Sequence, residues 1–166
     1  DRDILEVLAE MGPAGREAVP VLIDMVDEIV SSYSGEMSRL ILGPRSLTGY
    51  IETLGRMETT AKAAVPLLKR ILEMKDDENL AGVLGTRAAL ALWRIEGNAA
   101  EILPLLRREL ESARVQGRAA DSGPLATLDV IVAMGPAAHD LVPLLKKRLE
   151  GQGEMPLLAA HALLVV

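Results

Sequence analysis

The sequence contains no cysteine and no phenylalanine, and aromatic residues make up only 2 % of its 166 residues. Without cysteine the chain can form no disulfide, no thiolate metal site and no thiol nucleophile. Hydrophobic residues nevertheless make up 49 % of the chain, so any core must consist of leucine, alanine, valine, isoleucine and methionine. Leucine, alanine and methionine are good helix formers, and this composition favours helix packing over a β-rich core.

Long apolar runs are also missing, because no stretch approaches the ~18 uninterrupted apolar residues of a membrane helix. The N-terminus has neither an initiator methionine nor a secretory pattern. We therefore expect a soluble piece of a longer protein with no membrane span. A chain without cysteine suits the cytoplasm and the periplasm equally, so the compartment is left open.

The negative charge is concentrated near the N-terminus. Residues 1–30 carry eight acidic and two basic side chains, a net charge of −6 that equals the net charge of the whole chain. The residues after position 30 are neutral, with 16 basic and 16 acidic side chains. Such asymmetry bears on association with partners more than on the fold.

A phrase of ten residues that begins with an apolar residue and ends with proline occurs four times. The four copies are residues 11–20, 57–66, 95–104 and 134–143. Their first residues lie 46, 38 and 39 positions apart, which is the period of a two-helix repeat. Apolar residues recur at helical spacing before and after each phrase, so the sequence predicts hairpins of two amphipathic helices.

The spacing predicts nine principal helices in antiparallel hairpins and no strand. The first helices are expected at residues 2–11, 45–57, 80–95, 124–134 and 156–165, and a second helix follows each of the first four. The longer gap between the first two copies places an insertion near residues 31–44. Seven side chains on the apolar faces are expected in the core: Leu8, Leu54, Leu68, Leu92, Leu106, Ile131 and Leu145.

The joints carry residues that end and start helices. Gly-Pro at 12–13 and 135–136 ends one helix and offers a proline for the first turn of the next. Asn98 begins a sequence that resembles a capping box, and Thr59 or Thr60 can cap the second repeat. The proline that ends each phrase lies either in a first helical turn or at a kink, and the sequence leaves both open.

The pattern Leu-x-x-Met-Gly-Pro-Ala followed by Ala-Val-Pro-x-Leu, as in residues 8–22, resembles the HEAT-like repeats of the phycobilisome-lyase type. These repeats are common in bacterial scaffold proteins. The resemblance covers nearly the whole chain and implies an all-α fold, a right-handed α-α superhelix (HEAT-like solenoid) of about four and a half helical hairpins. It implies one HEAT-like repeat domain over residues 1–166, as a segment of a longer solenoid, that serves in interactions more than in catalysis.

No group of residues has the types and spacing that catalysis or a cofactor requires. The two histidines, His139 and His161, lie in different repeats without a His-Glu pair, so no metal is predicted. The serines lie in or beside predicted linkers and have no His-Asp context. Neither a dinucleotide fingerprint nor a phosphate-binding loop is present, and no cofactor is predicted.

Trp93 stands where two other repeats have the small residues Ala9 and Gly55. We interpret it as a core side chain that fills a gap between repeats, with a protruding position at the edge of the stack as the alternative. A single tryptophan without basic or aromatic neighbours makes a poor platform for stacking on bases.

Paired basic residues stand three and four positions after the proline in three of the repeats. They are Lys69, Arg70, Arg107, Arg108, Lys146 and Lys147. Because equivalent positions stack in a solenoid, we expect a strip that binds an acidic protein partner along repeats two to four. The alternative is a solvated face, since an acidic residue stands seven positions after every proline, within reach for local ion pairs.

The last helix, at residues 156–165, has no second helix to pair with. Its apolar residues are Leu157, Leu158, Leu163, Leu164, Val165 and, just after it, Val166. A terminal capping repeat carries a polar outer face, so we expect further repeats or another subunit to cover this apolar face.

These observations favour a noncatalytic protein-protein interaction or scaffolding module that presents a concave helical surface. The alternative is a chromophore lyase-like activity, which the resemblance implies, or a regulatory segment of a larger enzyme. Nucleic-acid binding is disfavoured by the net charge of −6 and the shortage of aromatic residues.

Overall fold

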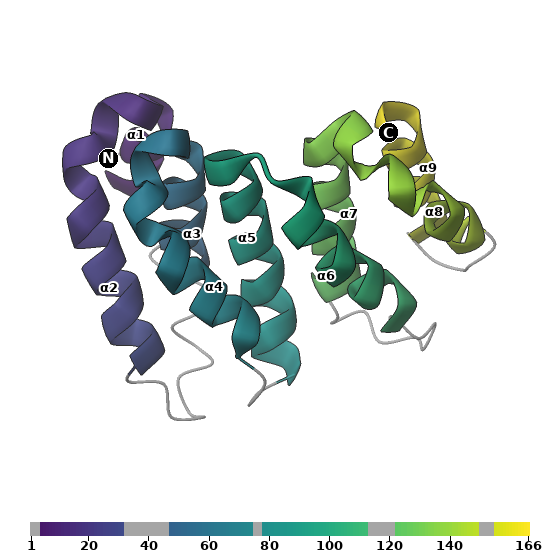
Figure 1. The fold of residues 1–166 in the computed structure, drawn as a ribbon, viewed down its shortest axis with the longest axis horizontal. Helices are drawn as coiled ribbons and strands as arrows, with labels where there is room; N and C mark the ends of the chain where they lie inside the picture. Colours follow the sequence, from purple (N-terminus) through teal and green to yellow (C-terminus); the bar gives the residue numbers. More distant parts are fainter. Residues whose placement is uncertain (1–3, 32–46, 75–77, 113–121, 150–154) are drawn as a thin grey trace. The chain divides into compact units, whose positions relative to one another are not determined.

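The computed structural model describes residues 4–31, 47–74, 78–112, 122–149 and 155–166. These residues form nine α-helices, three 3-10 segments and no strand, so the predicted all-α class is confirmed for them (Figure 1). In chain order the elements are α1 (Ile4–Met11), η1 (Gly12–Ala18), α2 (Val19–Ser31), α3 (Leu47–Arg56), η3 (Glu58–Ala64), α4 (Val65–Glu73), α5 (Glu78–Glu96), α6 (Ala99–Ser112), α7 (Ser122–Met134), η4 (Gly135–Leu141), α8 (Val142–Arg148) and α9 (Met155–Val165).

The chain divides into two compact units, residues 1–97 and 98–166. In unit 1, α3 packs between α1 and α5, and α2 and α4 lie across this layer (Figure 1). In unit 2, α7 packs on α9, and α6 and α8 contact each other and the α7–α9 layer. The division falls between the two helices of the third predicted hairpin. One domain over the whole chain stays a prediction, and the insertion near residues 31–44 lies almost entirely outside the described residues.

The buried side chains follow the apolar faces that the sequence predicts. Six of the seven expected core residues are at most 2 % exposed: Leu54, Leu68, Leu92, Leu106, Ile131 and Leu145. The prediction for Leu8 is wrong, because its side chain is only half-buried. The helix that carries it, α1, packs against α3 on one side and has no described helix of unit 1 on the other.

The recurring proline lies in a first helical turn in three of the repeats. Pro20, Pro66 and Pro143 are each the second residue of a helix, α2, α4 and α8 respectively. In the third repeat α6 begins earlier, at Ala99, and Pro104 lies inside it. The structure therefore places the proline in a first helical turn in three repeats and in the interior of a helix in the other.

The residue that caps α6 explains why this helix begins earlier relative to its proline than α2, α4 and α8 do. Asn98 caps α6 as predicted, with its Oδ1 accepting a hydrogen bond of 3.2 Å from the backbone N–H of Ala100. The predicted cap at Thr59 or Thr60 is wrong. Thr60 Oγ1 instead donates to the carbonyl oxygen of Met57 at 2.6 Å, because the chain passes from α3 into the 3-10 segment η3 without the extended residue that an N-cap needs.

Three joints share a left-handed residue directly after the apolar start of the phrase. Gly12 and Gly135 have φ of +51° and +54°, a conformation that ends a helix and that glycine adopts without steric cost. Glu58 occupies the same place in the second repeat with φ of +51°. A residue with a Cβ atom pays ~1–2 kcal/mol in this conformation.

We therefore expect Glu58→Gly to raise the free energy of unfolding by ~0.5–1 kcal/mol. The substitution relieves the backbone strain, and the greater entropy of glycine in the unfolded chain offsets part of this gain. Urea denaturation followed by circular dichroism measures the change. Glu58→Ala is the matched control, because it removes the same exposed carboxylate but keeps the Cβ atom. A gain of the same size for alanine would show that charge, not backbone strain, sets the stability at this position.

One described stretch, Thr127–Arg148, is long and apolar enough to cross a membrane, with 22 residues and a mean hydropathy of 1.4. Core helices of globular proteins meet the same criteria, so this is weak evidence for a membrane span. The left-handed Gly135 also divides the stretch, which consists of most of α7, the segment η4 and α8.

Candidate interaction surface on the second helices

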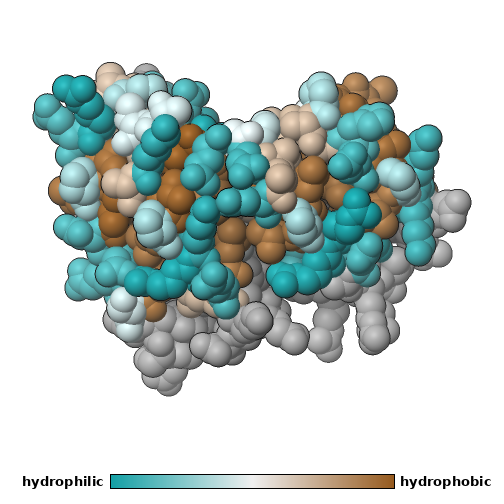
Figure 2. Space-filling model, viewed as in Figure 1, coloured by the Kyte–Doolittle hydropathy of each residue, from teal (hydrophilic) through white to brown (hydrophobic). Residues whose placement is uncertain are grey.

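The six basic residues predicted as a binding strip lie on α4, α6 and α8, the second helices of repeats two to four. Five of them are exposed, and Lys69 is half-buried. Figure 2 views the side of unit 1 on which α2 and α4 lie, where hydrophilic side chains stand beside exposed hydrophobic ones. Lys69 and Arg70 belong to unit 1, and the other four belong to unit 2.

In unit 1 the two basic residues of α4 bind acidic residues of neighbouring helices. Arg70 forms an ion pair with Asp27 of α2, and Lys69 Nζ lies 3.7 Å from Glu96 Oε2 at the end of α5. The partner of Arg70 therefore comes from the preceding repeat rather than from its own helix. The side chains of both pairs are 31–50 % exposed, so each pair contributes ~0–1 kcal/mol.

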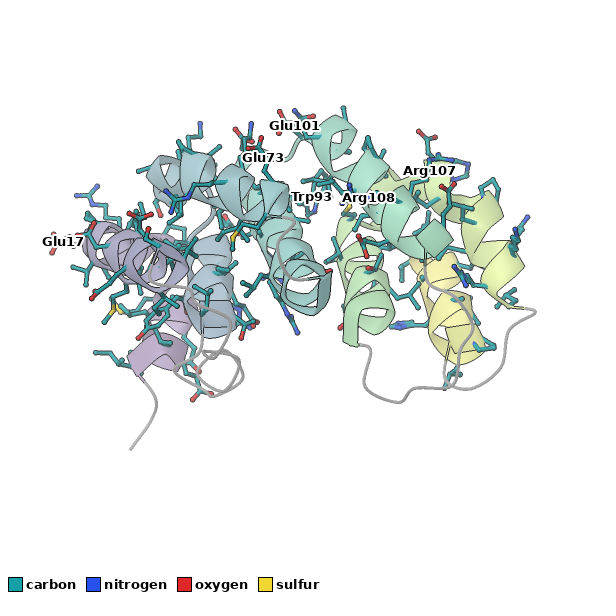
Figure 3. The ribbon with its side chains drawn as sticks, turned by 90° about the horizontal axis from the view of Figure 1, so that it is seen from below. Glu17, Glu73, Trp93, Glu101, Arg107 and Arg108 are labelled. Atoms are coloured by element: carbon teal, nitrogen blue, oxygen red, sulfur yellow. The ribbon has the colours of Figure 1, made fainter. Side chains whose placement is uncertain are left out.

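In unit 2 the arginines of α6 differ in what they contact (Figure 3). Arg107 Nη2 donates to the backbone carbonyl oxygen of Asp140 in η4 at 3.3 Å, which ties α6 to the next hairpin. Arg108 is 65 % exposed, and its Nη2 lies 3.8 Å from Glu109 Oε1. Lys146 and Lys147 are exposed on α8. Arg108, Lys146 and Lys147 are thus exposed members of the strip, and the described residues show no ion pair or hydrogen bond from them to another helix.

The remaining candidate residues lie on the surface or at its edge. Trp93 on α5 is half-buried, which lies between the core position that the sequence favoured and the protruding alternative. His139 and His161 are exposed. Within the described ranges, no three His, Cys, Asp or Glu side chains lie close enough to hold a metal ion.

The apolar face predicted for the last helix is present on α9. Leu157, Leu164 and Val165 are 74 %, 85 % and 36 % exposed, whereas Leu163 and Val166 are half-buried. The side chain of Leu158 lies outside the described residues. Among the described side chains of this helix, Ala159 and Ala162 are buried, whereas Leu157, Leu164 and Val165 face outward.

A second apolar surface, on the first hairpin, was missed by the sequence analysis. It comprises Ile4, Val7 and Met11 of α1 and Val21 and Met25 of α2, which are 37–68 % exposed. The sequence signal was available, because these residues recur at spacings of three and four and alternate with acidic residues. A buried apolar face has the same pattern, so only the packed structure distinguishes an exposed apolar face from a buried one.

No protein-family model, no curated protein and no solved structure matches this chain.

Proposed function

We propose that the chain is a noncatalytic protein-interaction module, built as a HEAT-like solenoid, that binds an acidic segment of a partner protein. The observation that carries the proposal is the recurrence of exposed basic side chains at equivalent positions of α4, α6 and α8, each beside a buried leucine that anchors the same helix. Such recurrence presents one chemical group repeatedly, which suits an extended partner better than a small ligand.

The packing within each unit supports the solenoid architecture. First helices pack on first helices, as α1, α3 and α5 do in unit 1 and as α7 and α9 do in unit 2. The joints repeat as well, with a left-handed residue after α1, α3 and α7 and a proline in the first turn of the following α-helix. Repeats of this kind bury their apolar faces by stacking, which leaves the other side of each second helix available for binding.

The ion pairs in unit 1 limit which residues of the strip can contribute to binding an acidic partner. Arg70 and Lys69 already have acidic partners, so a ligand would have to compete with Asp27 and Glu96. Arg108, Lys146 and Lys147 show no ion pair with another helix among the described residues, so we expect them to contribute most to binding. Exposed charges of this kind mainly raise the association rate, and their effect weakens as salt screens it.

The test is the binding of a poly-glutamate peptide to the full chain and to the variant Arg108→Glu/Lys147→Glu. We expect the variant to bind about tenfold more weakly at low salt, a loss of ~1.4 kcal/mol, and the difference to shrink as salt is added. Arg70 is left in place, because a glutamate there would stand beside Asp27 and disturb the packing of α2 on α4.

The matched control is Arg16→Glu/Lys62→Glu, which makes the same change in net charge at two exposed residues outside the strip. The control is expected to bind poly-glutamate within about twofold of the unmodified chain. Equal losses in the two double variants would mean that net charge alone governs binding, and the proposed strip would then be a solvated face.

A further inference from the structure

The first hairpin carries an exposed apolar surface that the basic strip does not use. Its members are Ile4, Val7 and Met11 on α1, which are 68 %, 37 % and 47 % exposed, and Val21 and Met25 on α2, which are 58 % and 42 % exposed. We call these five residues the outer face. Large aliphatic side chains are usually buried, and a group of them on one surface marks a site of interaction.

On α1 the outer face lies opposite the side that packs in unit 1. At about 100° per residue, Ile4, Val7 and Met11 fall within an arc of about 60°. Leu5, the buried residue of α1, lies about 160° around the helix from Val7. Because α1 packs against α3, these three side chains point away from the neighbouring repeat.

The same reasoning places Val21 and Met25 on the far side of α2. Asp27 forms an ion pair with Arg70 of α4, and therefore marks the side of α2 that faces the next repeat. Met25 lies about 160° around the helix from Asp27, and Val21 lies one turn before Met25. Figure 1 shows α1 and α2 at one end of unit 1, with no described helix of that unit beyond them.

Acidic side chains border the outer face. Glu6 on α1, Glu17 in η1 and Asp24 and Glu28 on α2 are all exposed. Asp24 and Glu28 each follow an apolar member by three residues, and Glu17 projects outward from the hairpin (Figure 3). Residues 4–31 hold six acidic side chains and a single basic one, Arg16, so the apolar surface lies in a negative field.

We infer that the outer face is a docking site for a basic amphipathic helix of a partner protein. Apolar residues at spacings of three and four on such a helix would contact the five side chains, and its lysines and arginines would meet the acidic border. Methionine suits this role, because its flexible and polarisable side chain adapts to partners of different shape. This site is separate from the proposed acidic-partner strip in residues and opposite to it in charge.

A second copy of the chain fits the outer face less well. A two-fold symmetric contact would place the acidic borders of two first hairpins against each other, which costs energy through like-charge repulsion. The exposed apolar surface on α9 offers no complementary charge, since residues 155–165 contain neither lysine nor arginine. The charge pattern therefore selects a basic partner.

The probe is a synthetic helical peptide of leucine and lysine, with leucine at positions spaced by three and four, titrated into the full chain. A peptide of identical composition in scrambled order tests whether the amphipathic arrangement matters. We expect the ordered peptide to bind the unmodified chain and the variant Val21→Ser/Met25→Ser to bind it about tenfold more weakly. The control Leu157→Ser/Leu164→Ser, which alters the exposed face of α9, should bind within about twofold of the unmodified chain.

Charge is tested separately with Asp24→Lys/Glu28→Lys against Glu73→Lys/Glu111→Lys, four exposed acids in two matched pairs. The first pair should weaken binding of the ordered peptide more than the second, and the difference should fall as salt rises. Equal binding by the two serine variants, or equal binding of the ordered and scrambled peptides, would overturn the inference. So would a concentration-dependent dimer of the unmodified chain that Val21→Ser/Met25→Ser abolishes, since a second copy would then occupy the face.

Discussion

Replacement of Leu106 by alanine should lower the free energy of unfolding by ~2–5 kcal/mol. Leu106 is 1 % exposed and lies on α6, which packs against α7, η4 and α8 in unit 2. Truncation removes three carbon atoms from this contact and leaves a cavity that rigid helices fill only in part. Urea denaturation of the full chain, followed by circular dichroism, measures the loss.

Leu157→Ala is the matched control for this experiment, because it makes the same truncation on α9 at a side chain that is 74 % exposed. Its effect should stay within ~0.5 kcal/mol, as is usual for surface positions. A loss below ~1 kcal/mol for Leu106→Ala would mean that the side chain does not pack in the core of unit 2, and the assignment of the buried face of α6 would fail.

The helices were predictable from sequence because the signals that define them are local. The ends of the first helices agree with prediction to within two residues, since glycine, proline and the helical spacing of leucine act over a few positions. The same argument predicted the cap at Asn98. It failed at Thr60, where the backbone continues into a 3-10 segment and the hydroxyl group binds a carbonyl oxygen behind it.

Contacts between distant residues could not be predicted in the same way. The sequence placed acidic residues within reach of each basic pair along its own helix, yet Arg70 binds Asp27, which lies 43 positions earlier. Leu8 has the spacing of a core residue and is half-buried, because burial depends on whether a neighbouring helix covers it. The outer face was missed for the same reason.

The positions of the six basic residues could be predicted, but their separate roles could not. Equivalence along the repeat correctly assigned all of them to second helices. It gave no means to distinguish Arg107, which donates to the backbone of η4, from Arg108, whose side chain is 65 % exposed. That distinction depends on the packing of α6 against η4, and it decides which residues are worth changing in a binding experiment.

Helices α3 and α5 of unit 1 approach each other closely at Gly55. A Cβ atom built on Gly55 would lie 2.9 Å from the Cα atom and 3.0 Å from the Cβ atom of Ala91 on α5. Real Cβ atoms do not come this near to another backbone, so any larger residue must push α3 away from α5. Both helices carry core residues, including Leu54 and Leu92, whose contacts would loosen together.

We expect Gly55→Leu to lower the free energy of unfolding by ~3 kcal/mol, the upper part of the range for overpacked cores. This loss is expected even though replacing glycine within a helix by itself adds ~1 kcal/mol of stability. Gly85→Leu on α5 is the matched control, because the nearest atom to its added Cβ is the end of the flexible Leu72 side chain at 3.9 Å. That variant should stay within ~1 kcal/mol of the unmodified chain, since its gain in helix propensity offsets any crowding. The two variants are compared in the same urea denaturation experiment. Equal stability of the two would show that α3 and α5 can separate at little cost, and that the small residue at position 55 does not set their spacing.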